Sequence, residues 1–281
     1  MAPAQFSHGP LVLGATGLVG RALARVWPVE GGAGLWQHRP GSAIRGPGAG
    51  LEWDILNAPL PVLPWPPSGM IVLAGVTGTD TATLAQNTDL ALAAVAAARR
   101  AGIGRVLIAS SQAVYGTAQP LVSETSPCRP VSPYGRAKLQ MEQALAGVEG
   151  VTLLRLGNVA GADSLLRTAS RQAPVLDRFA DGQSPRRSYI GPVTLARVLN
   201  RLLDPALDLP PVLNVASPGM VAMNDLLLAA RQPFTWTEAP PSALPRLELD
   251  VSRLADLVPL DPARADALVD EARRGGWSPR G

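Results

Sequence analysis

The segment Pro10-Leu-Val-Leu-Gly-Ala-Thr-Gly-Leu-Val-Gly20 decides how the rest of the chain is interpreted. It opens with a short apolar run, typical of a buried strand, and Leu18 to Trp27 has the pattern of a helix. Between them, Gly14, Gly17 and Gly20 permit a tight turn and close approach of the backbone to a ligand. A helix beginning there offers amide donors and positive potential to a phosphate. The spacing predicts a dinucleotide-binding turn, with an ordinary strand–helix turn as the alternative.

Outward from this turn, apolar runs alternate with helical patterns. Strands are predicted at 34–38, 51–53, 70–74, 104–110 and 151–156, and helices at about 81–100 and 134–146. This alternation predicts a parallel, doubly wound sheet buried on both faces, which is a Rossmann-type α/β fold.

Beyond residue 160 the pattern loosens. A strand is predicted at 212–215 and helices at 195–203, 224–231 and 264–274, with Thr194 as the N-cap of the first helix. Prolines are dense from 205 to 245, which indicates loops and short elements. We therefore expect a Rossmann domain and a small C-terminal substrate lobe. The domain is predicted at 1–160 with returning segments at about 188–216, and the lobe at 161–187 and 217–281.

Composition excludes several classes of protein. The net charge of +3 is small and its basic residues are scattered, which argues against nucleic-acid binding. The single cysteine, Cys128, cannot form an intrachain disulfide and favours a cytoplasmic location. It shows no metal-ligand spacing with His8 or His38, so no metal site is expected. The uncharged run 55–79 contains five prolines, which argues against a membrane-spanning helix.

A second motif is Ser132-Pro-Tyr-Gly-Arg-Ala-Lys138. Tyr134 and Lys138 are four residues apart on a predicted helix and so share one face. The pKa of a free tyrosine is near 10, and a neighbouring ammonium favours the phenolate. Lys138 is also the one lysine among 25 lysine and arginine residues, which suggests a site where an ammonium works and a guanidinium does not. A helix-surface contact is the alternative.

A third motif, Ile108-Ala-Ser-Ser-Gln-Ala-Val-Tyr-Gly116, ends the predicted strand at 104–110. Ligands of open α/β sheets bind at the carboxyl ends of strands. A serine hydroxyl at this strand end would therefore face the cofactor crevice. The alternative is a serine that only caps the following turn.

Together, the glycine triplet, the SSxxxYG strand end and the YxxxK pair resemble the extended short-chain dehydrogenase/reductase family, the NAD(P)-dependent epimerase/dehydratase group. Further matches extend over nearly the whole chain: Asp54-Ile55, Ala74-Gly75, Asn87, Leu154 to Asn158 with Gly161, Arg187 to Ile190, and Leu213 to Val215.

The resemblance implies a role for each matched residue. Tyr134 would be the general acid/base, and Lys138 would hold the nicotinamide ribose and lower the pKa of Tyr134. Ser111, with Ser110 as the alternative, would hydrogen-bond the reacting oxygen. Substrate contacts are implied for Ser111, Asn158 and Arg187, the last as the candidate for a phosphate. Cofactor contacts beyond Tyr134 and Lys138 are implied for Gly14, Thr16, Gly17, Leu18, Gly20, Asp54, Ile55, Ala74 and Gly75.

Two departures from the family pattern are informative. NAD-preferring members place an acid at the end of the second strand, but no acid occurs between Glu30 and Glu52. Arg39 stands there instead, which favours NADP over NAD, unless its side chain merely faces solvent. The family's dehydratases follow the catalytic hydroxyl with Asp-Glu, and here Gln112 and Ala113 take those places, which argues against dehydration.

We therefore expect an NAD(P)-dependent epimerase or oxidoreductase that acts on a hydroxyl or ketone of a sugar or nucleotide sugar. Epimerase and simple reductase stay open, because both use the same proton and hydride machinery. No nucleic-acid or membrane partner is expected, and a homodimer is allowed. The alternative is a catalytically silent NAD(P)-binding sensor or scaffold of the same fold. Such proteins typically lack the tyrosine–lysine pair, which this chain has.

Overall fold

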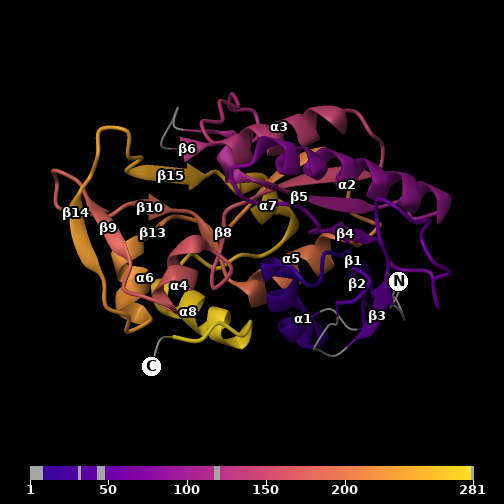
Figure 1. Cartoon of the computed structure of the whole chain (residues 1–281), viewed down its shortest axis with the longest axis horizontal. Helices are drawn as coiled ribbons and strands as arrows, with labels where there is room; N and C mark the ends of the chain where they lie inside the picture. The colour runs from indigo at the N-terminus through magenta and orange to yellow at the C-terminus, as the bar shows by residue number, and fades with distance from the viewer. Residues whose placement is uncertain (1–8, 31–32, 43–47, 117–120, 280–281) are drawn as a thin grey trace.

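The centre of the molecule is a seven-stranded parallel sheet in the order β12-β7-β5-β4-β1-β2-β3 (Figure 1). The structure, a computed structural model, describes residues 9–30, 33–42, 48–116 and 121–279. The strands are β1 (Leu11–Leu13), β2 (Leu35–His38), β3 (Ala49–Glu52), β4 (Met70–Val72), β5 (Val106–Ser111), β7 (Val151–Leu156) and β12 (Val212–Val215). This is the strand order of a Rossmann fold, so the predicted fold class is confirmed.

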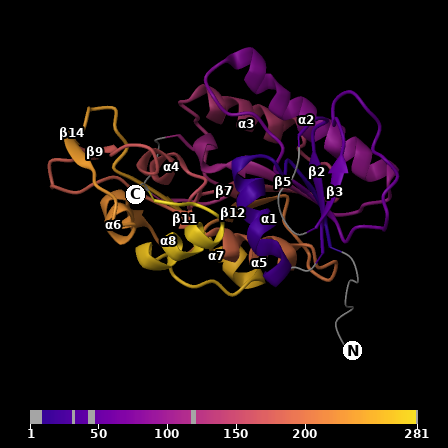
Figure 2. The same cartoon turned by 60° about the horizontal axis from the view of Figure 1, so that its bottom comes forward.

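Helices cover both faces of this sheet. On one face lie α2 (Thr81–Arg100) and α3 (Pro133–Ala144), and on the other α1 (Leu18–Glu30) and α5 (Pro192–Leu202) (Figures 1 and 2). The side chains of β1 alternate accordingly: Val12 packs with α1 and α5, whereas Leu11 and Leu13 pack with α2 and α3. Burial on both faces explains why these strands are continuous apolar runs in the sequence.

The order of the sheet also locates a crevice. The strands β1 and β4 are neighbours, yet the helices that follow them, α1 and α2, lie on opposite faces. At such a switch point the two connections diverge and leave space beyond the carboxyl ends of the strands. The glycine turn after β1 and the segment Ala74-Gly75 after β4 both begin there.

A smaller lobe lies beside the sheet, at the left of Figure 1. Its core is formed by α4 (Ser164–Ala169), α6 (Met223–Ala229) and α8 (Ala265–Arg274). Around this core are a four-stranded sheet and two strand pairs. These contain β13 (Val221–Ala222), β10 (Arg186–Arg187), β15 (Arg246–Leu249), β6 (Leu121–Val122), β9 (Val175–Arg178) with β14 (Thr235–Glu238), and β8 (Asn158–Val159) with β11 (Tyr189–Ile190). The strand β6 lies within the first 160 residues, which were predicted to belong to the Rossmann domain, yet it pairs in this lobe's sheet. The division into domains therefore stays a prediction.

The predicted start of the helix α5 and its predicted N-cap are wrong. The helix α5 begins at Pro192 rather than 195, its N-cap is Gly191, and Thr194 lies within its first turn. The capping carboxylate comes instead from Glu271 of α8, which accepts hydrogen bonds from the Thr194 amide at 2.8 Å and from its hydroxyl at 2.7 Å. A carboxylate there satisfies free amide groups and complements the helix dipole. Two short elements complete the chain, the 3₁₀ turn η1 (Gln112–Val114) and α7 (Ser252–Leu257).

In the part of the chain that the structure describes, no helix combines the length and the apolar character needed to cross a membrane. The proline-containing run 55–79 forms β4 and the loops on either side of it.

Candidate active site

The glycine turn after β1 approaches its neighbours too closely for any side chain. Gly14 has φ = +86°, and a Cβ on it would lie 2.5 Å from the Ala74 nitrogen. A Cβ on Gly20 would lie 2.3 Å from the Gly14 carbonyl oxygen, and the Gly17 amide donates to that same oxygen at 3.0 Å. The loop therefore packs tightly on β4 and leads directly into α1. This arrangement fits a pyrophosphate at the helix N-terminus.

Gln37 of β2 supports this turn and was missed in the sequence. Its Oε1 accepts from the Gly14 amide at 2.8 Å, and its Nε2 donates to the Trp53 carbonyl at 2.6 Å. The side chain is buried, so both bonds replace contacts with water. The signal available in the sequence was a polar residue directly after the apolar Leu35 and Trp36 of the predicted strand.

The residues expected around the adenosine end lie at the carboxyl ends of β2 and β3. Arg39 follows β2 and is exposed. Asp54 follows β3, and a hydrogen bond from the Asn57 side chain lowers the pKa of its carboxyl, with a smaller contribution from Arg39. Ile55 is buried in the apolar cluster beneath α2 and α3. Thr16 lies in the glycine turn itself, so the structure brings these predicted cofactor residues to one edge of the sheet.

Ser111 and Tyr134 meet where β5 and α3 come together. Ser132 caps α3 by accepting from the Gly135 amide at 3.0 Å, which fixes the start of the helix and with it Tyr134. The Ser111 hydroxyl accepts from the Ala113 amide at 3.2 Å and lies beside the Tyr134 side chain, whose pKa it lowers. The structure thus brings Ser111 to the tyrosine.

The alternative serine is engaged elsewhere. Ser110 points to the opposite side of β5, where its hydroxyl donates to Glu142 Oε1 at 2.5 Å and is buried. Because successive side chains of a strand face opposite ways, only one of the two serines can reach Tyr134.

Lys138 lies one helical turn beyond Tyr134 and is buried. Its Nζ donates to the Ala109 carbonyl at 3.0 Å and lies 6.0 Å from the centroid of the Tyr134 ring. A Cβ on Gly75 would lie 3.3 Å from this nitrogen and 2.8 Å from Asn87 Oδ1. The absence of a side chain at Gly75 therefore lets the segment after β4 pass directly beside the ammonium, which joins the cofactor residues to the tyrosine–lysine pair.

The pKa values of this pair are set mainly by burial. Burial lowers the pKa of Lys138 to about 8, and Glu142 opposes this. Burial also raises the pKa of Tyr134, opposed by the hydrogen bond from Ser111. The expected lowering of the Tyr134 pKa by Lys138 is therefore wrong for this structure. The desolvation of the phenolate outweighs an ammonium that lies 6.0 Å from the ring centroid.

On the substrate side, Asn158 and Arg187 have different surroundings. Asn158 begins β8, and its Oδ1 accepts from Gln112 Nε2 at 3.1 Å, one residue from the Ser111 hydroxyl. Arg187 lies in the lobe's sheet, where its guanidinium donates to the carbonyls of Leu244 at 2.7 Å and Pro245 at 3.3 Å. Burial lowers the pKa of Arg187. Asn158 is thus brought to the triad, whereas the guanidinium of Arg187 is bound to backbone, and its role towards a phosphate stays a prediction.

A buried polar network behind the triad was also missed. Arg155 of β7 binds the Glu142 carboxylate through Nε and Nη2, with a shortest distance of 2.7 Å, and its Nη1 donates to Tyr115 at 3.0 Å. The Tyr115 hydroxyl donates to Asn214 of β12 at 2.6 Å. This network crosses three adjacent strands. The sequence signal was the presence of charged residues in apolar strand and helix patterns.

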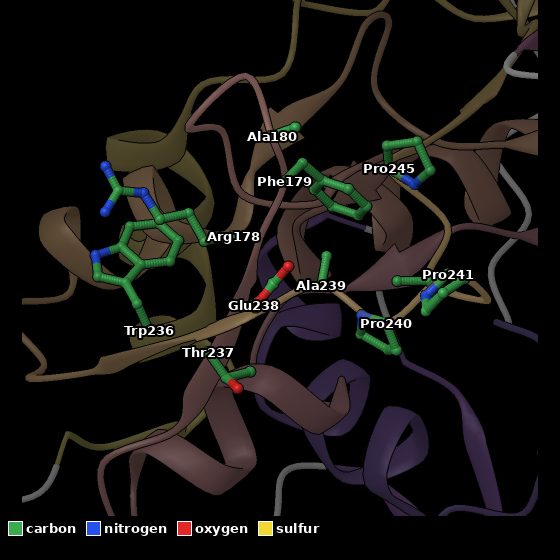
Figure 3. A pocket seen from close by; sticks show the side chains of 11 residues that line it. Arg178, Phe179, Ala180, Trp236, Thr237, Glu238, Ala239, Pro240, Pro241 and Pro245 are labelled. Carbon is green, nitrogen blue, oxygen red and sulfur yellow. The ribbon is translucent and has the colours of Figure 1, made fainter.

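The small lobe carries a separate hollow of about 660 Å³. Figure 3 shows Arg178 and Trp236 on one side of it and Pro240, Pro241 and Pro245 on the other, with Glu238 between them. No predicted site residue lines it. Among the residues described, no three histidine, cysteine or acidic side chains gather in a way that could hold a metal ion.

The sheet order and the glycine turn define a Rossmann-type α/β fold. The model of the NAD dependent epimerase/dehydratase family matches residues 63–199 of the chain. Over 89 residues the chain is 42% identical to a UDP-glucose 4-epimerase from Azospirillum brasilense, a match covering 29% of this chain. The matched segment spans only 25% of the length of that relative.

Solved structures show the same fold along nearly the whole chain. A UDP-glucose 4-epimerase from Stenotrophomonas maltophila, with bound NAD and formylated UDP-arabinopyranose, gives a TM-score of 0.77 at 17% identity. The alignment covers 95% of this chain and 97% of that one. An NAD dependent NDP-hexosamine 5,6-dehydratase gives a TM-score of 0.72 at 19% identity. The alignment covers 95% of this chain and 97% of the dehydratase. At these identities the likeness establishes the fold.

Proposed function

We propose that the chain is an NAD(P)-dependent epimerase or oxidoreductase that acts on a sugar or nucleotide-sugar hydroxyl or ketone through Ser111, Tyr134 and Lys138. The observation that carries this proposal is the placing of Ser111 beside Tyr134, whose pKa it lowers, with the buried Lys138 ammonium one helical turn away. These groups stand at the carboxyl ends of the central strands, where an open α/β sheet binds its ligands.

Each side chain has a role that its contacts support. Tyr134 exchanges a proton with the substrate oxygen, and Ser111 positions that oxygen by a hydrogen bond to it. Lys138 holds the ribose hydroxyls beside Gly75, where the chain has no side chain to exclude them. The nicotinamide, when bound, supplies the acceptor and donor for hydride. The raised pKa of Tyr134 keeps its hydroxyl protonated at neutral pH, so the tyrosine begins as an acid unless ligand binding changes its surroundings.

We also propose a preference for NADP over NAD, with NAD as the alternative. Arg39 supports NADP because it is exposed at the end of β2, and its guanidinium forms no hydrogen bond with any residue that the structure describes. The structural relative with 0.77 TM-score has bound NAD, which supports the alternative.

Epimerisation is favoured over dehydration by the chemistry of Gln112. This side chain is buried and donates to Asn158, next to the proposed catalytic serine. An amide has no proton to give to a leaving hydroxyl at neutral pH, so the position lacks the acid that an elimination requires. The epimerases among the relatives act on UDP sugars, and UDP-glucose is therefore the first substrate to test.

The test is a panel of UDP sugars with NAD and NADP, with products separated by chromatography and absorbance followed at 340 nm. Interconversion of two sugar epimers without net cofactor reduction supports the epimerase, and stoichiometric reduction of the cofactor supports a simple oxidoreductase. Cofactor binding without turnover on any sugar supports the alternative of a silent sensor or scaffold. The intact Ser111–Tyr134 contact argues against that alternative, since a silent protein has no need of it.

A further inference from the structure

The face of α3 that carries Lys138 also carries Glu142. The two residues are four apart and therefore adjacent on one side of the helix, and both are buried. Each contacts β5: the Lys138 ammonium donates to the Ala109 carbonyl, and the Glu142 carboxylate accepts from the Ser110 hydroxyl. The helix is thus bound to two consecutive residues of the strand that ends at Ser111.

Arg155 fixes the Glu142 carboxylate from the next strand. Its Nε lies 3.1 and 3.2 Å from the two carboxylate oxygens, and its Nη2 lies 2.7 Å from Oε2. The remaining nitrogen donates to Tyr115 and to the Glu124 carbonyl. A forked contact of this kind sets the orientation of both planar groups. The carboxylate consequently cannot rotate away from the helix face that it shares with the lysine.

We propose that Glu142 is a positioning residue of the active site, which acts through Lys138 by holding its ammonium charged and in place at the end of β5. This inference rests on the proposed function for what the ammonium does, but not for whether Glu142 controls it. Burial disfavours the charged form of Lys138, and Glu142 is the charged neighbour that opposes this effect. The position therefore provides the countercharge that a desolvated cation needs.

The other groups described around Lys138 do not place a negative charge beside its ammonium. Tyr134 precedes it on the same helix, and β5 presents the neutral Ser110 and Ser111. The segments after β4 and in α2 present Gly75 and the neutral amide of Asn87. Arg155 on β7 binds the Glu142 carboxylate, and its positive charge opposes the effect of that carboxylate on Lys138. Tyr115 and Glu124 lie beyond Arg155.

Because Lys138 is the one lysine in the sequence, its ionisation can be measured directly. Protein labelled with ¹³C at the lysine Cε gives a single lysine signal, which is titrated by NMR. We expect Glu142→Gln to lower the pKa of Lys138 by about one to two pH units from its value in the natural chain. This follows because a neutral amide replaces a carboxylate one helical turn away, at an effective dielectric constant near 20.

Three further variants make the result specific. Ser110→Ala removes a hydrogen bond to Glu142 without removing charge, and Glu142→Asp keeps the charge, so both should leave the lysine titration close to that of the natural chain. If Glu142→Gln does not fold, the double variant Glu142→Gln/Arg155→Met removes both buried charges, a change that buried ion pairs often tolerate. It should show a downward shift that is smaller, because the lost positive charge of Arg155 partly offsets the lost negative charge of Glu142.

Superimposable lysine titrations in the natural chain and in Glu142→Gln or the double variant would overturn the proposal, even if thermal stability falls, because Glu142 would then be structural only. In active enzyme, the alkaline limb of kcat should move to lower pH with the lysine, since the protonated form is lost earlier. Failure to turn over any sugar would refute the proposed function and leave the titration result standing.

Discussion

The central sheet and the small lobe hold their side chains in different ways. The inner strands of the sheet are buried on both faces, and all six residues of β7 are buried. In the lobe, strands are two to four residues long, and all four residues of β14 are exposed. A side chain at the end of a buried strand inherits its position from packing on both sides. A side chain on an exposed strand such as β14 lacks packing of this kind.

This difference suggests that the two regions have different roles in the protein. The groups proposed for proton transfer require fixed geometry, and they lie on β5 and on α3, which packs against the sheet, with Lys138 only 5% exposed. The lobe offers a hollow lined by exposed groups such as Arg178 and by Trp236, which is 41% exposed. We therefore expect substitutions in the sheet to alter rates and cofactor affinity, and matched substitutions in the lobe to leave both nearly unchanged.

The largest effect is expected from Tyr134→Phe. Removing the hydroxyl leaves no proposed proton donor, so turnover of the sugar substrate should fall by about a thousandfold while cofactor affinity stays similar. Steady-state kinetics and cofactor titration measure the two quantities. The matched control is Tyr189→Phe, which removes a hydroxyl in the lobe's core and should change turnover less than tenfold. Near-natural turnover in Tyr134→Phe would show that the tyrosine is not the acid.

Lys138→Arg should have the next largest effect, a loss of about a hundredfold in turnover with weaker cofactor binding. A planar guanidinium cannot replace a compact ammonium in the buried space between Tyr134 and Gly75. Arg136→Lys on the exposed face of the same helix is the control and should be neutral. Full activity of Lys138→Arg would mean that the single lysine is an accident of composition.

A smaller effect is expected from Arg39→Ala, a loss of about tenfold in NADP affinity with little change for NAD. A charge-assisted hydrogen bond to a 2′-phosphate raises affinity by roughly ten- to a hundredfold. The exposure of Arg39 favours the lower value. Titration of both cofactors at two salt concentrations measures this, with the exposed Arg178→Ala in the lobe as the control. If both cofactors weaken alike, Arg39 does not distinguish them and NAD is the natural partner.

The same contrast explains which parts the sequence predicted. The strand at 151–156 and the helix at 81–100 are correct at both ends, since periodic burial leaves a clear pattern. The helix α4 and strands β9, β14 and β15 were missed, because short and partly exposed elements leave no such pattern. For the site, glycine spacing and the YxxxK pair predicted which residues assemble. The sequence could not predict long-range partners such as Gln37 with Gly14, which depend on the sheet order.

The smallest effect concerns a contact that joins the two regions, the Glu271 carboxylate of α8 at the start of α5. Glu271→Gln keeps the size of the side chain and one acceptor oxygen for Thr194, but removes the negative charge from the helix N-terminus. The stability lost should be about 1 kcal/mol, within the range for a partly buried charge at a helix end. Chemical denaturation measures it, and Glu238→Gln on the exposed β14 is the control, expected to change nothing. A loss close to zero would mean that the hydrogen bonds to Thr194 suffice without charge. A loss above about 3 kcal/mol would mean that α8 is required for the sheet itself to fold, and the two regions would then be one cooperative unit.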